Sequence, residues 1–359
     1  MKRNWMRRLW AAALCILLLA GCSPVSSSSA ASSTPAADPL TGLEPEAPGQ
    51  RPAAVIIDNS PGCTTQWGIG SASVVLEAAT DLHSPTSLCL VYPSVEAMPT
   101  VGPVTIGQDL YWQLLSAQQV LPVQLGCSVF ARNFLDHRNL RAVDALEVGR
   151  NAFTCGEDWV THPLWRTSGA AVAQVLPSLG LSASLTADSA AATEAENPAT
   201  VPPLLPLQNG EDHLPEPDAT DAAKAVIHFQ TQSSTGFAYN SRTDTYGMLS
   251  TDGTPQLDAN TGAQAAFDNV LVLFCSSTLR EDARSLDYDL TMGGGVWLNG
   301  GRLWNITWTL GTDSTLALYD ATGQSLALKG GRSYLALLSS VTGEELTVQD
   351  STGQSLPGQ

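Results

Sequence analysis

A proline-rich, acidic stretch at residues 181–222 divides the sequence into two parts with different hydrophobic patterns. The stretch holds six prolines and eight carboxylates, and no Lys or Arg occurs between Arg166 and Lys224. Such a composition favours a linker or a long loop over a regular element. The chain has 359 residues, which is enough for two domains of roughly 100–200 residues each. We therefore interpret 181–222 as an acidic linker between two domains.

Residues 39–180, before this linker, predict an α/β domain. The apolar runs 53–57, 88–92 and 121–125 are typical of strands. Helical spacing of apolar residues occurs between these runs, at 72–79 and 110–120, and after the last one, at 130–135. Alternation of strands and helices indicates a mixed sheet with at least partly parallel pairing.

Residues 223–345, after the linker, predict a smaller β-rich domain, and 346–359 form a tail. Asn299, Gly300 and Gly301 lie between two strand-like runs and favour a hairpin, because Asn and Gly accept positive φ. A second hairpin is expected around 320–323, and the run 333–338 is expected to close a meander. Three tryptophans within 297–308 fit sheet packing better than a ligand-stacking platform.

The first residues have the features of a bacterial lipoprotein signal. Residues 1–21 join a basic start to an apolar run of about twelve residues, too short to span a bilayer as a helix. Leu19-Ala20-Gly21-Cys22 resembles the lipobox, in which the cysteine is lipidated and becomes the new N-terminus. The alternative is an ordinary secretory signal with a chance cysteine. The Ser-rich segment 22–38 is typical of a flexible tether, so we expect a chain that is anchored to the membrane through Cys22.

Charge excludes one class of partner. The net charge is −17, and after residue 21 the only lysines are Lys224 and Lys329. Nucleic-acid binding needs clustered Lys and Arg, so no nucleic-acid partner is expected.

The cysteines do not predict a metal site. Beyond Cys15 and Cys22, five remain, at positions 63, 89, 127, 155 and 275, and none forms a C-x-x-C pair. Two interpretations stay open: all five are reduced packing residues, or one disulfide forms among Cys63, Cys127 and Cys155. We expect no metal and no cofactor.

The sequence contains no clear catalytic motif. G-x-S-x-G is absent, so no nucleophile elbow is predicted. Cys127 and His162 could form a nucleophile–base pair, but no orienting partner is evident and a buried thiol beside a structural histidine is favoured. We therefore predict no catalytic residue and leave enzymatic activity open.

Several phrases occur in an order that resembles the YerB-like lipoproteins, a bacterial family of unknown function. Asp38–Leu43 is similar to the opening N-P-L-T-G, and Arg51–Asn59 to the strand R-P-x-A-V-x-I-x-N. Gly68–Glu77 resembles G-L-S-x-A-D-I-V-Y-E, and Val101–Val104 the start of G-P-V-R-S-A-R. The segment 162–168 is similar to H-N-x-Y-x-S. The resemblance implies an α/β N-terminal domain and a smaller C-terminal β-rich one.

Departures from the family pattern concern charge. Both arginines of G-P-V-R-S-A-R are replaced, by Thr105 and Gln108, and further cationic positions read Ser87 and, near Tyr246, Gly247 or Met248. The polar residues that remain give the candidate ligand-binding set, which we expect at the strand ends of the N-terminal domain: Asp58, Asn59, Glu77, Gly102, Pro103 and His162. The alternative is that Asp58 and Asn59 only cap a turn and that Glu77 is solvated on a helix.

These observations favour a lipid-anchored, extracytoplasmic protein that binds an envelope polymer or a partner protein without catalysis. An enzyme that acts on cell-wall material is the alternative. A solute-binding protein for a transporter fits less well, because its two lobes are usually similar and these halves differ in class.

Overall fold

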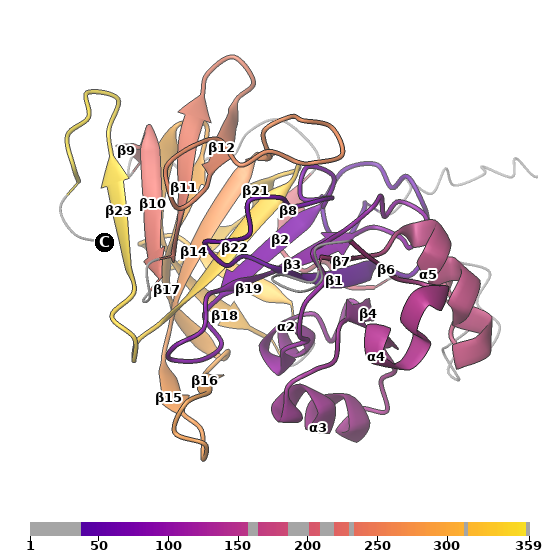
Figure 1. Ribbon diagram of the computed structural model, residues 1–359. Helices are drawn as coiled ribbons and strands as arrows, with labels where there is room; N and C mark the ends of the chain where they lie inside the picture. The colour runs from indigo at the N-terminus through magenta and orange to yellow at the C-terminus, as the bar shows by residue number, and fades with distance from the viewer. Residues whose placement is uncertain are drawn as a thin grey trace, which may run out of the picture. The chain divides into compact units, whose positions relative to one another are not determined.

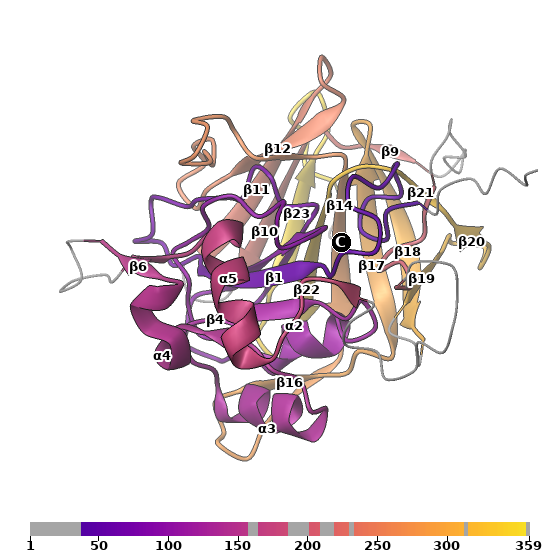
Figure 2. The same cartoon turned by 90° about the vertical axis from the view of Figure 1, so that its right-hand side faces the viewer.

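The computed structural model describes residues 37–156, 164–185, 201–208, 219–229, 233–311 and 315–356. Its strands form one large mixed sheet and a smaller antiparallel sheet (Figure 1). The helices are short and lie in the N-terminal part (Figure 2). The expected fold class, an α/β part with a mixed sheet followed by a β-rich part, is confirmed.

Both parts of the chain contribute strands to the large sheet. The N-terminal part supplies β1 (Ala53–Asp58), β2 (Val74–Ala78), β3 (Ser87–Tyr92), β4 (Leu121–Gln124) and β5 (Val143–Asp144). The rest of the chain supplies β9 (Thr220–Asp221), β14 (Asn269–Cys275), β17 (Met292–Asn299), β18 (Arg302–Leu310), β19 (Leu316–Tyr319), β20 (Ser325–Leu326) and β22 (Ser333–Ser339). Their order is β20-β19-β18-β17-β14-β22-β2-β3-β1-β4-β5, and β9 pairs with β18.

The smaller sheet has the order β13-β12-β11-β10-β23. Its strands are β13 (Ala266–Phe267), β12 (Thr245–Leu249), β11 (Ser233–Asn240), β10 (Lys224–Phe229) and β23 (Glu345–Gln349). Three two-stranded pairs complete the strands: β15 (Ser277–Leu279) with β16 (Leu286–Tyr288), β21 (Leu328–Lys329) with β8 (Leu207–Gln208), and β6 (Thr154–Cys155) with β7 (Trp165–Arg166). The helices are α2 (Asp109–Leu114), α3 (Val129–His137), α4 (Ala145–Val148) and α5 (Gly169–Val175), with 3₁₀ turns at Gly149–Asn151 and Leu176–Leu179.

Two apolar cores cover the two faces of the large sheet. Successive side chains of a strand point to opposite faces, so Val55 and Ile56 of β1 enter different cores. The first core packs against the smaller sheet and against α4 and α5. The second packs against α2 and α3 and includes the fully buried Trp112. The large sheet is therefore covered on both faces, which explains why its central strands are continuously apolar.

Strand β22 does not close a C-terminal meander as the sequence predicts. It lies parallel between β14 and β2, with Leu335 paired to both Leu271 and Leu76. The residues 36–359 form one compact unit. The expectation of two separable domains therefore does not fit the topology, because strands from both sides of 181–222 alternate in one sheet.

The predicted helix at 72–79 is also wrong. This segment forms β2, and all five of its residues are buried between β3 and β22. Apolar residues at close spacing fit a buried strand as well as a helix, and β-branched Val74 and Val75 favour the strand. Strands at 53–57, 88–92 and 121–125 are confirmed, as are the helices near 110 and 130.

The hairpin at Asn299–Gly301 is confirmed. It joins β17 to β18, and both glycines have positive φ, +55° at Gly300 and +76° at Gly301. Trp297 and Trp304 stack with ring centroids 4.7 Å apart, and both are almost fully buried. The tryptophans therefore pack the sheet, as predicted.

The stretch 181–222 is not wholly a linker. Leu204 and Leu205 are fully buried in the second core, and β8 and β9 pair with strands of the C-terminal part. Where the structure describes helices, none has the length and apolar character needed to cross a membrane.

We predict that cleavage between 186 and 200 will not release two folded fragments, since β22 remains hydrogen-bonded between β2 and β14. A protease site inserted there should give two bands on a denaturing gel but one elution volume in native size-exclusion chromatography. The same cleaved sample in urea is the control, where two volumes are expected. Two separate peaks in native buffer would contradict this topology.

Candidate functional site

The candidate site lies at one edge of the large sheet, where six strands end together. β1, β4 and β5 are mutually parallel, as are β2, β22 and β14. β3 pairs antiparallel with both β1 and β2, so these two groups point in the same direction. In open sheets of this kind, ligands bind outside the carboxyl ends of the strands. The strands end at Asp58, Ala78, Gln124, Asp144, Cys275 and Ser339.

Glu77 is the most deeply buried acid of this edge, with 0% of its surface exposed. It lies one residue before the end of β2. Its Oε1 accepts hydrogen bonds from Asn59 Nδ2 and Thr86 Oγ1, both at 2.6 Å, and its Oε2 accepts one from the hydroxyl of Tyr334. The alternative that Glu77 is solvated on a helix is wrong.

Burial raises the pKa of the Glu77 carboxyl to about 7, because removal from water disfavours the charged form. Hydrogen bonds from Thr86, Thr235 and Asn59 act in the opposite direction, and the nearby Glu344 raises the pKa further. Thr235 belongs to β11 and Tyr334 to β22. The carboxyl is therefore held between the two sheets by side chains from four distant segments.

Asp58 and Asn59 have different roles. Asp58 accepts hydrogen bonds from the Ser60 amide and hydroxyl, at 2.9 and 3.0 Å, and so closes the turn after β1. Asn59 instead connects Glu77 to Gln66, whose Nε2 donates to Asn59 Oδ1 at 3.0 Å. The turn-capping alternative thus holds for Asp58 and not for Asn59.

Gly102 and Pro103 pass close to the end of β1. The Asp58 amide donates to the Pro103 carbonyl at 2.8 Å, and the bond between Gly102 and Pro103 is cis. A Cβ on Gly102 would lie 2.6 Å from the carbonyl oxygen of Trp165, so this approach requires glycine. The structure therefore brings together all the candidate residues that it describes. His162 lies outside the described residues.

The positions where the family pattern has cations lie in different surroundings. The Thr105 amide donates to Ile56 at the end of β1, and the Ser87 hydroxyl contacts that of Tyr111, 3.3 Å away. Gly247 lies in the smaller sheet against the Gln264 side chain. Gln108 precedes α2 and lines a small pocket with Arg280.

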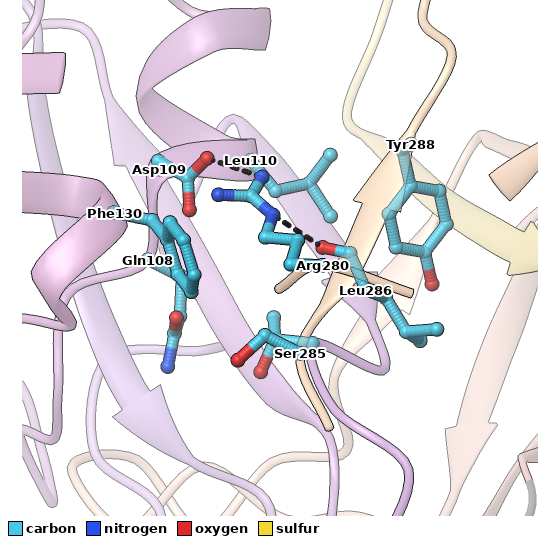
Figure 3. Close-up of a pocket in the computed structure, with 9 residues that line it drawn as sticks. Gln108, Asp109, Leu110, Phe130, Arg280, Ser285, Leu286 and Tyr288 are labelled. Atoms are coloured by element: carbon cyan, nitrogen blue, oxygen red, sulfur yellow. Dashed lines mark hydrogen bonds and ion pairs between the residues drawn. The ribbon is translucent and has the colours of Figure 1, made fainter. Parts of the chain in front are cut away.

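Arg280 is the feature of this edge that the sequence did not reveal. Its guanidinium lies 4.2 Å above the Phe130 ring and pairs with Asp109 at 2.7 Å (Figure 3). It also pairs with Asp287 at 2.8 Å. Its Nε donates to the Leu286 carbonyl at 3.1 Å. The hairpin of β15 and β16 thereby contacts α2 and α3. The pocket beside Arg280 measures about 10 Å³, which is room for about one water molecule.

A second carboxyl with a raised pKa follows β22. Burial raises the pKa of the Glu344 carboxyl to about 7, although its Oε2 accepts a hydrogen bond from the Ser339 amide at 2.7 Å. Among the residues that the structure describes, no three His, Cys, Asp or Glu side chains converge as they would around a metal ion. Burial raises both carboxyl pKa values, and the nearby Glu344 adds to the shift of Glu77.

The described cysteines are all unpaired. Cys89 and Cys275 are buried in their strands. Burial raises the pKa of the Cys63 thiol to about 12 and also raises that of Cys127. A thiol with a raised pKa is a poor nucleophile at neutral pH.

Comparisons with known proteins agree with this fold. Residues 40–178 match the N-terminal domain, and residues 225–335 the C-terminal domain, of a family described as protein of unknown function DUF3048. The two domain models together match more than half of the chain, and the chain belongs to this family. No curated protein matches the sequence.

The structure is similar to the crystal structure of the YerB protein from Bacillus subtilis. The TM-score is 0.70 and the sequence identity 21%, over 86% of this chain and 99% of that one. At this identity the likeness shows the fold alone. The resemblance to the YerB-like family that the motifs indicate is confirmed.

We predict that Glu77→Gln will flatten the pH dependence of stability. In the folded protein the Glu77 carboxyl keeps its proton up to about pH 7, whereas in the unfolded chain it loses it near the ordinary value of 4.5. The free energy of unfolding therefore falls as pH rises from about 4.5 to 7, by on the order of a few kcal/mol. Urea unfolding at pH 5 and pH 8 should show a smaller difference in Glu77→Gln.

The control is Glu345→Gln, which changes an exposed carboxyl of β23. This variant should keep the pH dependence of the unchanged protein. If Glu77→Gln keeps it as well, the buried Glu77 carboxyl does not titrate in this range.

Proposed function

We propose that this chain is a lipid-anchored protein of the extracytoplasmic face of the cell membrane that binds an envelope polymer or a partner protein. The observation that carries the proposal is the order of Leu19–Cys22, the Ser-rich segment 22–38 and the turn that starts at Asp38. Asp38 Oδ1 accepts hydrogen bonds from the Leu40 and Thr41 amides, at 3.0 and 2.9 Å. Leu40 is fully buried, so the residues directly after the expected tether belong to the packed part.

A tether of this kind favours binding close to the membrane. A Ser-rich chain behaves as a flexible coil, so its mean reach grows only with the square root of its length. The segment 22–38, as a tether of this kind, would keep the folded part near the lipid surface, where envelope components and other anchored proteins are concentrated. Such a tether would support a binding role, in which the folded part contacts the ligand.

The alternative, an enzyme that acts on cell-wall material, is favoured by the carboxyl groups of Glu77 and Glu344, since a pKa of about 7 suits general acid–base catalysis. Glu77, however, is fully buried and accepts hydrogen bonds from four side chains. A group so enclosed does not reach a substrate, which is why binding is the better conclusion.

The edge of the sheet fits a ligand without net negative charge. Asp58 and Asp144 end β1 and β5, and Glu344 lies between β22 and β23. Arg280 is paired with Asp109 and Asp287. Approach of an anion would require desolvation without a compensating cation.

We predict that Cys22→Ala will abolish membrane attachment, because lipidation needs the sulfur of this residue. Cell fractionation and labelling with radioactive palmitate should show an unlabelled protein that is unprocessed or shed into the medium. Cys15→Ala, which leaves Cys22 in place, is the matched control and should stay labelled in the membrane fraction. Labelled, membrane-bound Cys22→Ala protein would refute the anchor.

We also predict that Thr105→Arg with Gln108→Arg will introduce anion binding at this edge. Calorimetry with a glycerol phosphate oligomer should show an affinity at least about tenfold higher than for the unchanged protein, because each guanidinium adds a charge-assisted hydrogen bond. Ala321→Arg with Gln324→Arg makes the same charge change in the exposed turn between β19 and β20 and is the control.

Tight binding of the oligomer by the unchanged protein would contradict the conclusion that the edge disfavours anions. Gln108→Arg alone provides a second variant if the half-buried Thr105 does not tolerate arginine, and thermal unfolding shows whether each variant folds.

A further inference from the structure

A cavity of about 450 Å³ lies at the opposite edge of the large sheet, where β1 and β4 begin. Arg51 precedes β1 and Val120 precedes β4, whereas the candidate site described above lies at the carboxyl ends of the same strands. Cavities that hold small molecules measure about 300–1,000 Å³, so this one has the size of a ligand site.

More than half of the lining residues are apolar. They come from α2 and the residue after it, from the start of β4, from the loop after α3 and from the segment after the second 3₁₀ turn: Trp112, Leu115, Val120, Pro122, Leu140, Leu181 and Leu185. Several separate segments of the chain thus meet around one space, as in a site for an apolar body.

The protein itself satisfies the two arginines of the wall. Arg51 is 6% exposed, and its Nε and Nη2 donate to two backbone carbonyls, at 2.7 and 3.3 Å. Arg141 donates to the Leu179 carbonyl at 2.6 Å and pairs with Glu147 at 3.0 Å. Neither guanidinium is therefore left to compensate the charge of a ligand.

A charged ligand has no other partner in this wall. Among the described residues that line the cavity there is no Lys, His, Asp or Glu. An ionised group that entered the cavity would lose its hydration without gaining an ion pair. An anion would in addition approach a chain of net charge −17. The cavity therefore favours an uncharged ligand.

Two exposed side-chain amides belong to the same wall. Gln119 lies between α2 and β4, and Asn139 follows α3. Both residues have positive φ, 50° at Gln119 and 51° at Asn139. A side-chain amide both donates and accepts hydrogen bonds, so each can bind a hydroxyl, ester or amide group of an uncharged molecule.

We propose that this cavity binds a neutral amphiphile: an apolar body against the leucines and Val120, with a hydroxyl, ester or amide group beside Gln119 and Asn139. The site is independent of the envelope-binding role proposed above, because it lies at the other end of β1 and β4. Burial of apolar surface accounts for affinity, and the two side-chain amides orient the polar group.

Fluorescence titration with the neutral probe N-phenyl-1-naphthylamine tests the proposal, with 1-octanol and octanoate as competitors of equal chain length. The full-length chain carrying Cys22→Ala serves as the parent, so that no lipid is attached and no detergent competes for the probe. The parent should bind the probe saturably, and 1-octanol should displace it. Octanoate should displace it at least about tenfold more weakly, because the carboxylate loses hydration without gaining an ion pair.

Two sets of variants locate the binding. Leu181→Trp and Leu140→Trp each fill the cavity from a different segment and should abolish displaceable binding of the probe. Leu279→Trp, at an exposed position of β15, is the matched control and should bind as the parent does. Gln119→Gly with Asn139→Gly removes both amides at positions whose positive φ glycine accepts. This double variant should weaken binding of 1-octanol by about threefold to tenfold and leave that of the probe unchanged.

Thermal unfolding shows that each variant is folded before it is titrated, and the exposed positions 119 and 139 keep the test valid if a tryptophan variant does not fold. Equal binding of the probe by the parent and by folded Leu181→Trp or Leu140→Trp would overturn the proposal. An unchanged affinity for 1-octanol in the double glycine variant would do the same. Displacement by octanoate as effective as that by 1-octanol, or absence of saturable binding to the parent, would overturn it as well.

Discussion

Strand β22 is hydrogen-bonded on both sides, to β2 through Val74–Ala78 and to β14 through Asn269–Cys275. Both pairings are parallel, and the β2 pairing joins residues about 260 positions apart in the sequence. Because β22 occupies the centre of the sheet, its removal would expose the apolar faces of both neighbours. The N-terminal part and the C-terminal part therefore stabilise one another, and both family domains contribute strands to the large sheet.

The same strand determines the state of Glu77. Tyr334 of β22 donates its hydroxyl to this carboxyl, and Tyr334 also packs against Phe237 of the smaller sheet, with ring centroids 4.7 Å apart. The smaller sheet excludes water from the face on which Glu77 lies, and this burial raises the carboxyl pKa to about 7. Loss of these hydroxyl and amide donors would leave a buried carboxyl without hydrogen-bond partners, which costs free energy of folding. Its donors come from β22, from β11, from the turn after β1 and from Thr86 before β3, and they thus fix the relative positions of four segments.

Features set by neighbouring residues could be predicted from the sequence, whereas features set by distant pairings could not. Gly300 and Gly301 define their hairpin locally, and Cys89 lies in an apolar run that forms a strand in almost any context. The apolar spacing at 72–79 fits both a helix and a strand, and the pairing with β3 and β22 is what makes this segment a strand.

The candidate site divides in the same way. Asp58 and Asn59 could be placed together because they follow one strand, but the donor Tyr334 and the cation Arg280 come from the other part of the chain.

The arginines at the two ends of β1 are held by groups of the protein itself. At the carboxyl end the partly buried Arg280 is paired with Asp109 and Asp287. At the amino end Arg51 donates to the carbonyls of Gln119 and Val120, and Arg141 donates to the Leu179 carbonyl and pairs with Glu147 at 3.0 Å. These arginines therefore join segments of the fold: Arg280 links the hairpin of β15 and β16 to α2, and Arg51 links the start of β1 to the residues before β4.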